Sequence, residues 1–263
     1  MSWKAMVINP VEGHTSGPFE ALWYSEPYFK QIKEYLEGKG VSVSYLYKER
    51  AVRAEVWGKL SGSWHRYIVA VGHGGADVFT GYRLNKVFWV DMAGEGYSHL
   101  WTGGTVLLML SCLTARRLGP YFTRHGAWSY LGWEKPFAFY VKLGVRKRGS
   151  WRESPDLLYH KPVEEAFARC AAGEYTPGQA YRHIYDRYTE YINNPDIPER
   201  WRSVLKYDRD HMKLLGNTGH PPPIPAPPLP ALTLALGMIP VAVTLGAVAA
   251  SELSKQRVPG VVW

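Results

Sequence analysis

Cysteine is scarce in this chain of 263 residues, which has only Cys112 and Cys170. Two thiols exclude a disulfide-rich secreted scaffold, because they allow one bridge at most. The amino terminus lacks the long apolar segment and small-residue cleavage site of a secretory signal, so no cleaved signal is expected. The histidines show no paired spacing of the kind that binds zinc, so neither a metal nor a cofactor is expected.

Charged side chains are missing from one long stretch, the 38 residues from Leu214 to Ser251. Seven of the ten residues 221–230 are proline, which predicts a semi-rigid polyproline spacer of about 3 Å per residue. The apolar run from Leu229 to Ala250 would be about 33 Å long as a helix, enough for a hydrocarbon core of about 30 Å. We expect a transmembrane helix over 231–250. Because Pro240 interrupts the run, the alternative is a buried hairpin or a partner-binding segment.

The predicted organisation is therefore a globular domain over 1–215, a proline-rich linker over 216–230, a membrane helix over 231–250 and a short tail over 251–263. Basic residues on both sides of the apolar run leave its orientation open. Without a secretory signal, we expect a single-pass C-terminal anchor that holds the domain in the cytoplasm. The net charge of +8 lies mainly in the globular part, is modest and accompanies no recognised nucleic-acid motif, so a nucleic-acid partner is not expected.

The globular part is rich in apolar side chains, with 11 Trp, 18 Tyr and 8 Phe in the whole chain. Strand-like apolar runs alternate with helix-like segments, which predicts an α/β domain with a mainly parallel sheet and helices on both faces. Strands are expected over 5–9, 41–47, 67–71, 105–110 and 127–132, helices over 24–37 and 50–60, and a hairpin or loop with two strands over 76–92. From residue 161 onward helices dominate, with Pro162 and Pro177 in first turns.

Two of the expected strands end in residues that can do chemistry. The run 67–71 leads to His73 and Gly74, and the run 105–110 leads to Cys112. Sites in parallel sheets lie beyond the carboxyl ends of the strands, so the two side chains would face one crevice if their strands are neighbours. An imidazole can take the proton of a thiol and later give one to a leaving amine. The N–H groups of Gly74 and Cys112 could then bind an oxyanion.

Taken singly, each feature has a simpler interpretation. A cysteine at the end of an apolar strand is usually a small core side chain, and a glycine-rich loop is often only a turn or a phosphate cradle. Residues 72–77 lack the glycine spacing of a dinucleotide site and the Gly-Lys-Ser/Thr of a phosphate loop. The two strand ends together are more informative.

Residues 67–74 and 106–112 resemble the two motifs of the caspase-like (clan CD) cysteine peptidases, the group of caspases, gingipains, clostripain, legumain and separase. The two residues are 39 positions apart, within the range that this group suggests. The resemblance covers about residues 5–133 and implies the caspase-like fold. It also implies that His73 is the general base and acid, Cys112 the nucleophile, and Gly74 with Cys112 the oxyanion donors. Residues 110–114, Leu-Ser-Cys-Leu-Thr, depart from the Gln-Ala-Cys-x-Gly of true caspases, so a preference for Asp is not implied.

Three further places in the sequence bear on substrate binding or on self-cleavage. Trp133-Glu134 resembles the pair that partners a substrate arginine in separase-like members, which implies that both residues bind substrate; the alternative for Glu134 is a surface carboxylate. Asp77 is the next acidic candidate, or a turn residue. The basic run Arg146, Lys147 and Arg148 predicts an exposed loop open to self-cleavage; the alternatives are a solvated loop without that role, or a patch that touches anionic lipid or nucleic acid.

The sequence therefore predicts a membrane-anchored cysteine endopeptidase that cleaves protein or peptide substrates after a basic residue. The alternative is a catalytically inactive caspase-like module that binds a partner at the membrane. The oligomeric state is not indicated.

Overall fold

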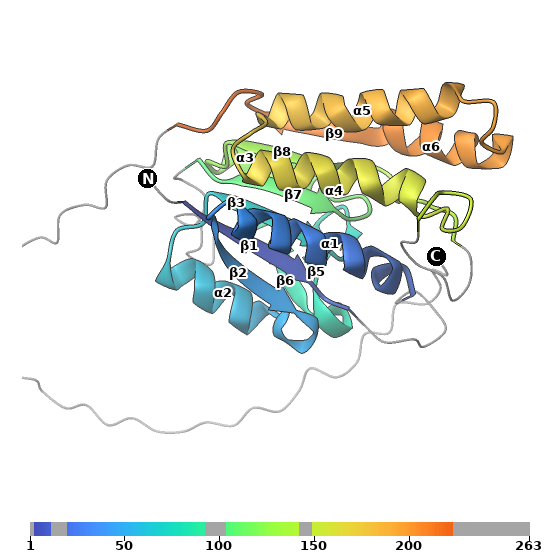
Figure 1. Ribbon diagram of the computed structural model, residues 1–263. Coiled ribbons are helices and arrows are strands. Elements are labelled where there is room, and N and C mark those ends of the chain that lie inside the picture. The colour runs from blue at the N-terminus through green and yellow to red at the C-terminus, as the bar shows by residue number, and fades with distance from the viewer. Residues whose placement is uncertain (1–2, 12–19, 93–103, 142–148, 223–263) are drawn as a thin grey trace, which may run out of the picture. The chain divides into compact units, whose positions relative to one another are not determined.

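The computed structural model describes residues 3–11, 20–92, 104–141 and 149–222. These residues lie within one compact unit, Met1–Ile224. Its centre is a six-stranded sheet in the order β2-β1-β3-β7-β8-β9, in which β9 alone is antiparallel to its neighbour (Figure 1). The strands are β1 (Lys4–Asn9), β2 (Ser42–Tyr47), β3 (Tyr67–Val71), β7 (Val106–Leu110), β8 (Ser129–Trp133) and β9 (Met212–Gly216). The expected α/β fold with a mainly parallel sheet is confirmed.

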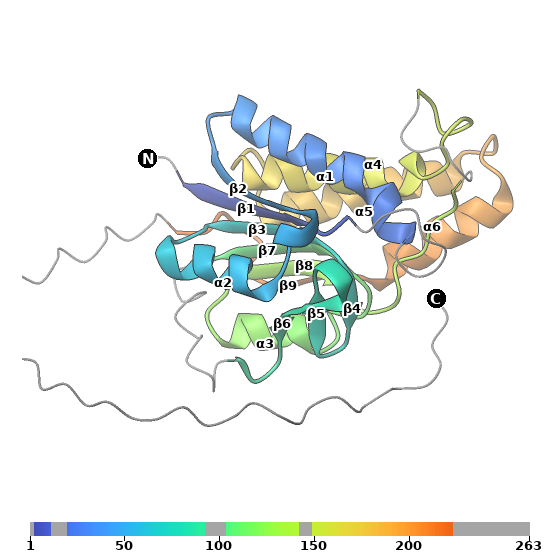
Figure 2. The same cartoon turned by 90° about the horizontal axis from the view of Figure 1, so that it is seen from below.

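The sheet is covered on both faces, which explains why its central strands are continuous apolar runs. Every residue of β3, β7 and β8 is buried, and alternate residues enter two separate hydrophobic clusters. On the first face lie α1 (Glu20–Gly38), α4 (Leu157–Ala171), α5 (Pro177–Asn193) and α6 (Glu199–His211), as Figure 2 shows. On the second face lie α2 (Arg53–Gly62), α3 (Leu118–Arg124) and a small sheet.

The small sheet has the order β4-β5-β6 and is antiparallel throughout. Its strands are β4 (His73–Gly75), β5 (Val78–Thr80) and β6 (Lys86–Trp89). The hairpin expected over 76–92 is confirmed. The sequence did not show that His73–Gly75 adds a third strand, because a glycine-rich triplet has no strand pattern of its own.

The helical part agrees with the sequence at one proline and corrects it at another. Pro177 is the first residue of α5, after Thr176, whose side chain accepts from Gln179 N in a capping box. Pro162 was wrongly placed in a first turn: it lies inside α4, which begins five residues earlier at Leu157. Without an N–H, Pro162 cannot donate to the carbonyl of Leu158.

Three elements differ from the expectations. No pattern in the sequence indicated α3 or β9, and the five residues of β9 precede the proline stretch. The helix expected over 50–60 is a short 3₁₀ turn (Lys48–Arg50) followed by α2. Within the described residues, none of the helices has the length and apolar character to cross a bilayer. The span expected over 231–250 and the tail after it lie outside the described residues.

Candidate active site

The ends of β3 and β7 bring His73 and Cys112 to the same edge of the sheet. The two strands are adjacent and parallel, with Val71 opposite Leu110. His73 and Cys112 each follow their strand by two residues, and Gly72 N donates to the Leu110 carbonyl at 3.4 Å. The strands that precede the two residues are therefore neighbours, which is the condition for His73 and Cys112 to face one crevice.

The alternation of β3 and β7 predicts a common face for the two side chains. A Cβ on Gly72 would meet the ring of Phe79 on the second face, and one on Gly74 would meet Ser111 Oγ. Successive residues of extended chain point to opposite sides, so the alternation counted on from Val71 and Leu110 assigns His73 and Cys112 to the first face, that of α1, α4, α5 and α6. For Cys112 this agrees with the effect of Asp208, on α6, on its thiol.

Gly74 is a point of close approach between the two strand ends. A Cβ there would lie 2.3 Å from both the Cys112 carbonyl oxygen and Ser111 Oγ, closer than atoms can pack. The sequence suggested that the N–H of this glycine binds an oxyanion. In the structure its missing side chain first admits the Cys112 turn, which sets the position of the thiol relative to His73.

The turn after Cys112 carries backbone strain. Leu113 has φ of 62°, in the left-handed region that costs a non-glycine residue about 1–2 kcal/mol. The turn is held by Leu113 N donating to Lys135 O at 3.3 Å and Ala115 N donating to Trp133 O at 3.0 Å. Both acceptors belong to the chain at the end of β8, so β8 fixes the shape of this turn.

Electrostatics leave the pair neutral at rest. Burial raises the pKa of the Cys112 thiol; hydrogen bonds with the backbone of Phe137 and of Cys112 itself lower it, and the Asp208 carboxylate raises it. Burial also lowers the pKa of the His73 imidazole. A thiol and a neutral imidazole are the forms in which the imidazole can accept the thiol proton.

Asp208 is the residue of this site that the sequence did not reveal. It lies on α6, is fully buried, and accepts from Ala138 N through Oδ1 at 3.0 Å. Its Oδ2 has no hydrogen-bond partner among the described residues, and burial raises its pKa well above the usual range. Most residues of α6 are charged, so the composition of the helix does not distinguish Asp208 from its neighbours. The available signal was its spacing of three from Leu205, the other buried residue of α6.

The predicted substrate-binding residues are engaged within the protein. Trp133 is fully buried, and its Nε1 donates to the Asp208 carbonyl at 3.0 Å. Glu134 Oε1 lies 3.1 Å from Lys213 Nζ, and both carboxyl oxygens of Asp77 lie 2.9 Å from the guanidinium of Arg117. These three roles stay predictions. The loop with Arg146, Lys147 and Arg148 lies outside the described residues.

Cys170 is buried in α4, as expected of a packed thiol, and burial raises its pKa. Over 3–11, 20–92, 104–141 and 149–222 there is no cluster of three or more metal-binding side chains.

Comparison with known proteins gives a likeness in structure and none in sequence. No protein-family model matches the chain, and no curated protein matches it. Among solved structures, the chain is similar to the complex of the pro- and mature domains of RgpB from Porphyromonas gingivalis, with a TM-score of 0.53 and 10% identity over 82% of this chain and 48% of that one. It is also similar to the Arg-specific cysteine proteinase gingipain R, with a TM-score of 0.54 and 11% identity over 83% of this chain and 47% of that one.

The chain spans about half the length of these two structures. At this level of identity the likeness concerns the fold alone. That fold is the one expected from the two strand ends, and the chain thus has the architecture of the caspase-like cysteine peptidases.

Proposed function

We propose that the protein is a cysteine endopeptidase that uses a His73–Cys112 dyad. The observation that supports the proposal is that the two residues follow the carboxyl ends of adjacent parallel strands. The caspase-like architecture supports it.

The reaction follows from the chemistry of the two side chains. His73 accepts the proton of Cys112, and the sulfur attacks the carbonyl carbon of the scissile peptide bond. The N–H groups of Gly74 and Cys112 are the proposed donors to the oxyanion. The C–N bond then breaks, the leaving amine takes the proton from His73, and a thioester forms on Cys112. A water molecule that gives a proton to His73 attacks the thioester, which releases the carboxylic acid and restores the thiol.

A basic residue before the scissile bond is the finer part of the proposal. Three carboxylates lie near the strand ends, and two of them, Asp77 and Glu134, already pair with cations. Asp208 has an unmatched buried oxygen and acts on the charge of Cys112. Burial favours the neutral form of Asp208, and a substrate cation paired with it would favour the carboxylate and offset the charge that the carboxylate sets against the thiolate. Because Asp208 is fully buried and accepts from Ala138 N, such a side chain reaches it only if the chain at Ala138 moves aside.

A thiol-reactive peptidyl probe with Arg at its first position tests the reaction. We expect it to label the wild type and the control Cys170→Ser, and to fail with Cys112→Ser and His73→Ala. A folded wild type that is not labelled would instead favour the inactive module, for which the burial of both groups is the supporting observation.

The source of specificity is tested by comparing Arg and Glu probes on Asp208→Asn and Glu134→Gln. Loss of the Arg preference in the first variant alone would assign the specificity to Asp208, and loss in the second alone would assign it to Glu134. An equal response to both probes in the wild type would remove the basic preference.

A further inference from the structure

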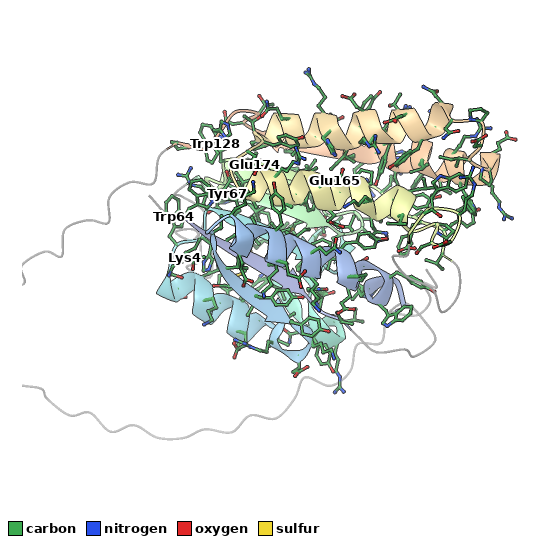
Figure 3. The ribbon with its side chains drawn as sticks, in the orientation of Figure 1. Lys4, Trp64, Tyr67, Trp128, Glu165 and Glu174 are labelled. Carbon is green, nitrogen blue, oxygen red and sulfur yellow. The ribbon has the colours of Figure 1, made fainter. Side chains whose placement is uncertain are left out.

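After β9 the chain lies at the end of the sheet opposite His73 and Cys112, because Gly216 at the end of β9 pairs with Ser129 at the start of β8. Arg66 directly precedes β3, Trp128 directly precedes β8, and Gly104 lies two residues before β7. These positions are the amino ends of strands whose carboxyl ends carry or flank the dyad. Figure 3 shows Trp64 and Trp128 at the same end of the molecule.

Residues 217–222 are held there by donors of the domain. Trp128 Nε1 donates to the Gly219 carbonyl at 2.9 Å, and Gly178 N donates to the Thr218 carbonyl at 2.8 Å. The guanidinium of Arg66 donates through Nη1 to the Pro221 carbonyl at 3.1 Å and through Nη2 to the Pro222 carbonyl. Every one of these bonds uses a carbonyl of the segment.

This arrangement matches what a proline-rich chain can offer. Proline has a backbone carbonyl but no N–H, so its recognition depends on donors such as indole and guanidinium groups and on aromatic or flat surfaces for its ring. Pro221 is buried, and a Cβ on Gly104 would lie 3.3 Å from Cδ of Pro222. The Arg66 guanidinium lies 5.8 Å from the ring centre of Trp64. We call Trp64, Arg66, Gly104 and Trp128 the proline cradle.

The proline cradle has more donors than residues 217–222 use. Arg66 is 7% exposed, and its Nε is buried without a hydrogen-bond partner among the described residues. Trp64 Nε1 is buried and unmatched in the same way. Unmatched buried donors are unfavourable, so both groups point to an acceptor. The sequence after Pro222 continues with prolines at 223, 225, 227, 228 and 230, which carry the same acceptor and no donor.

We propose that the proline cradle is a binding site for a proline-rich segment in the polyproline II conformation, and that its occupant is this chain's own segment, which enters the site at residue 217. Residues 217–222 are thus docked on the domain, where their composition suggests a free spacer. A tethered ligand of this kind is present at an effective concentration of the order of millimolar, so the chain's own segment excludes a free competitor.

The experiment uses the full chain and a free peptide with the sequence of residues 217–230. In the variant Pro221→Gly/Pro222→Gly, which weakens the preorganised segment, we expect the indole N–H resonance of Trp128 to shift. Added peptide then produces a saturable shift of the Trp64 and Trp128 resonances. The wild type does not respond at the same peptide concentrations.

Two controls distinguish recognition of proline from non-specific peptide binding. A peptide with every proline replaced by alanine binds the glycine variant at least about tenfold more weakly, and so does the normal peptide when Arg66→Lys is added, because lysine cannot serve two carbonyls with a fork. If Arg66→Lys fails to fold, Trp128→Phe keeps the ring, removes the donor and weakens binding. An unshifted Trp128 in the glycine variant, no saturation, or equal binding of the alanine peptide would overturn the proposal.

Discussion

Replacing Gly74 by alanine gives a direct test of how the two strand ends position the nucleophile. The new Cβ would lie 2.3 Å from the Cys112 carbonyl oxygen, whereas an ordinary contact is near 3.4 Å. The backbone must therefore move by about 1 Å, since the Cys112 carbonyl oxygen is a backbone atom and no side-chain rotation can relieve the clash. Such overpacking costs about 1–3 kcal/mol of unfolding free energy, or about 2–4 °C in Tm for each kcal/mol in a domain of this size.

The same shift displaces the thiol from its position relative to His73, and misplacement of this size lowers catalytic efficiency by about 10²-fold. The neighbouring Gly75→Ala is the matched control, because its Cβ would lie 3.4 Å from Val78 Cγ1 in ordinary contact. The assays are the rate of labelling by the Arg probe and thermal unfolding. Gly74→Ala with the labelling rate and Tm of Gly75→Ala would refute the role assigned to this close approach.

Four further predictions address charge, self-processing and the tail. Asp208→Asn lowers the pKa of Cys112, because it removes a charge that opposes the thiolate, so the pH midpoint of Cys112 alkylation by iodoacetamide falls; an unchanged midpoint would disprove the coupling. His65 has its pKa lowered to about 4 by burial, so the unfolded chain binds more protons below pH 6.5. Stability is therefore intact above pH 6.5 and falls by up to about 3 kcal/mol as the pH drops toward 4 in urea titrations, a slope that His65→Asn removes. Self-cleavage at Arg146, Lys147 or Arg148 yields two fragments in purified wild type and none in Cys112→Ala; a break that persists in the variant would exclude self-processing. Full-length protein floats with lipid vesicles, and a chain whose residues 231–250 are replaced by a Gly/Ser sequence of equal length does not; equal flotation would exclude the anchor.

The sequence predicted that His73 and Cys112 follow the ends of two strands, because these strands are buried and parallel. Such strands appear as continuous apolar runs, and the residues after them stand out by chemistry, as His73 and Cys112 do. Their adjacency in the sheet required the strand order, which no local pattern contains.

Asp208 and the proline cradle were hidden for different reasons. Asp208 belongs to a helix in which charged residues are the rule, so only its burial and its hydrogen bond from Ala138 N set it apart. In the proline cradle Arg66 binds the carbonyls of Pro221 and Pro222, which are 155 and 156 residues away in the sequence. Every residue has a backbone carbonyl, so side-chain patterns do not indicate which carbonyl acts as an acceptor. Composition correctly indicated a proline-rich extended segment and could not indicate what it contacts.

The direct passage from α6 into β9 has a mechanical consequence. Helix α6 ends at His211 and β9 begins at Met212, so no loop separates the last helical turn from the edge strand. A pull on the chain beyond residue 222 loads the Arg66 and Trp128 bonds first and then the five residue pairs of the β8–β9 ladder. Only after both yield does tension reach Asp208. The two attachments in series therefore shield the edge that carries His73 and Cys112 from forces applied beyond residue 222.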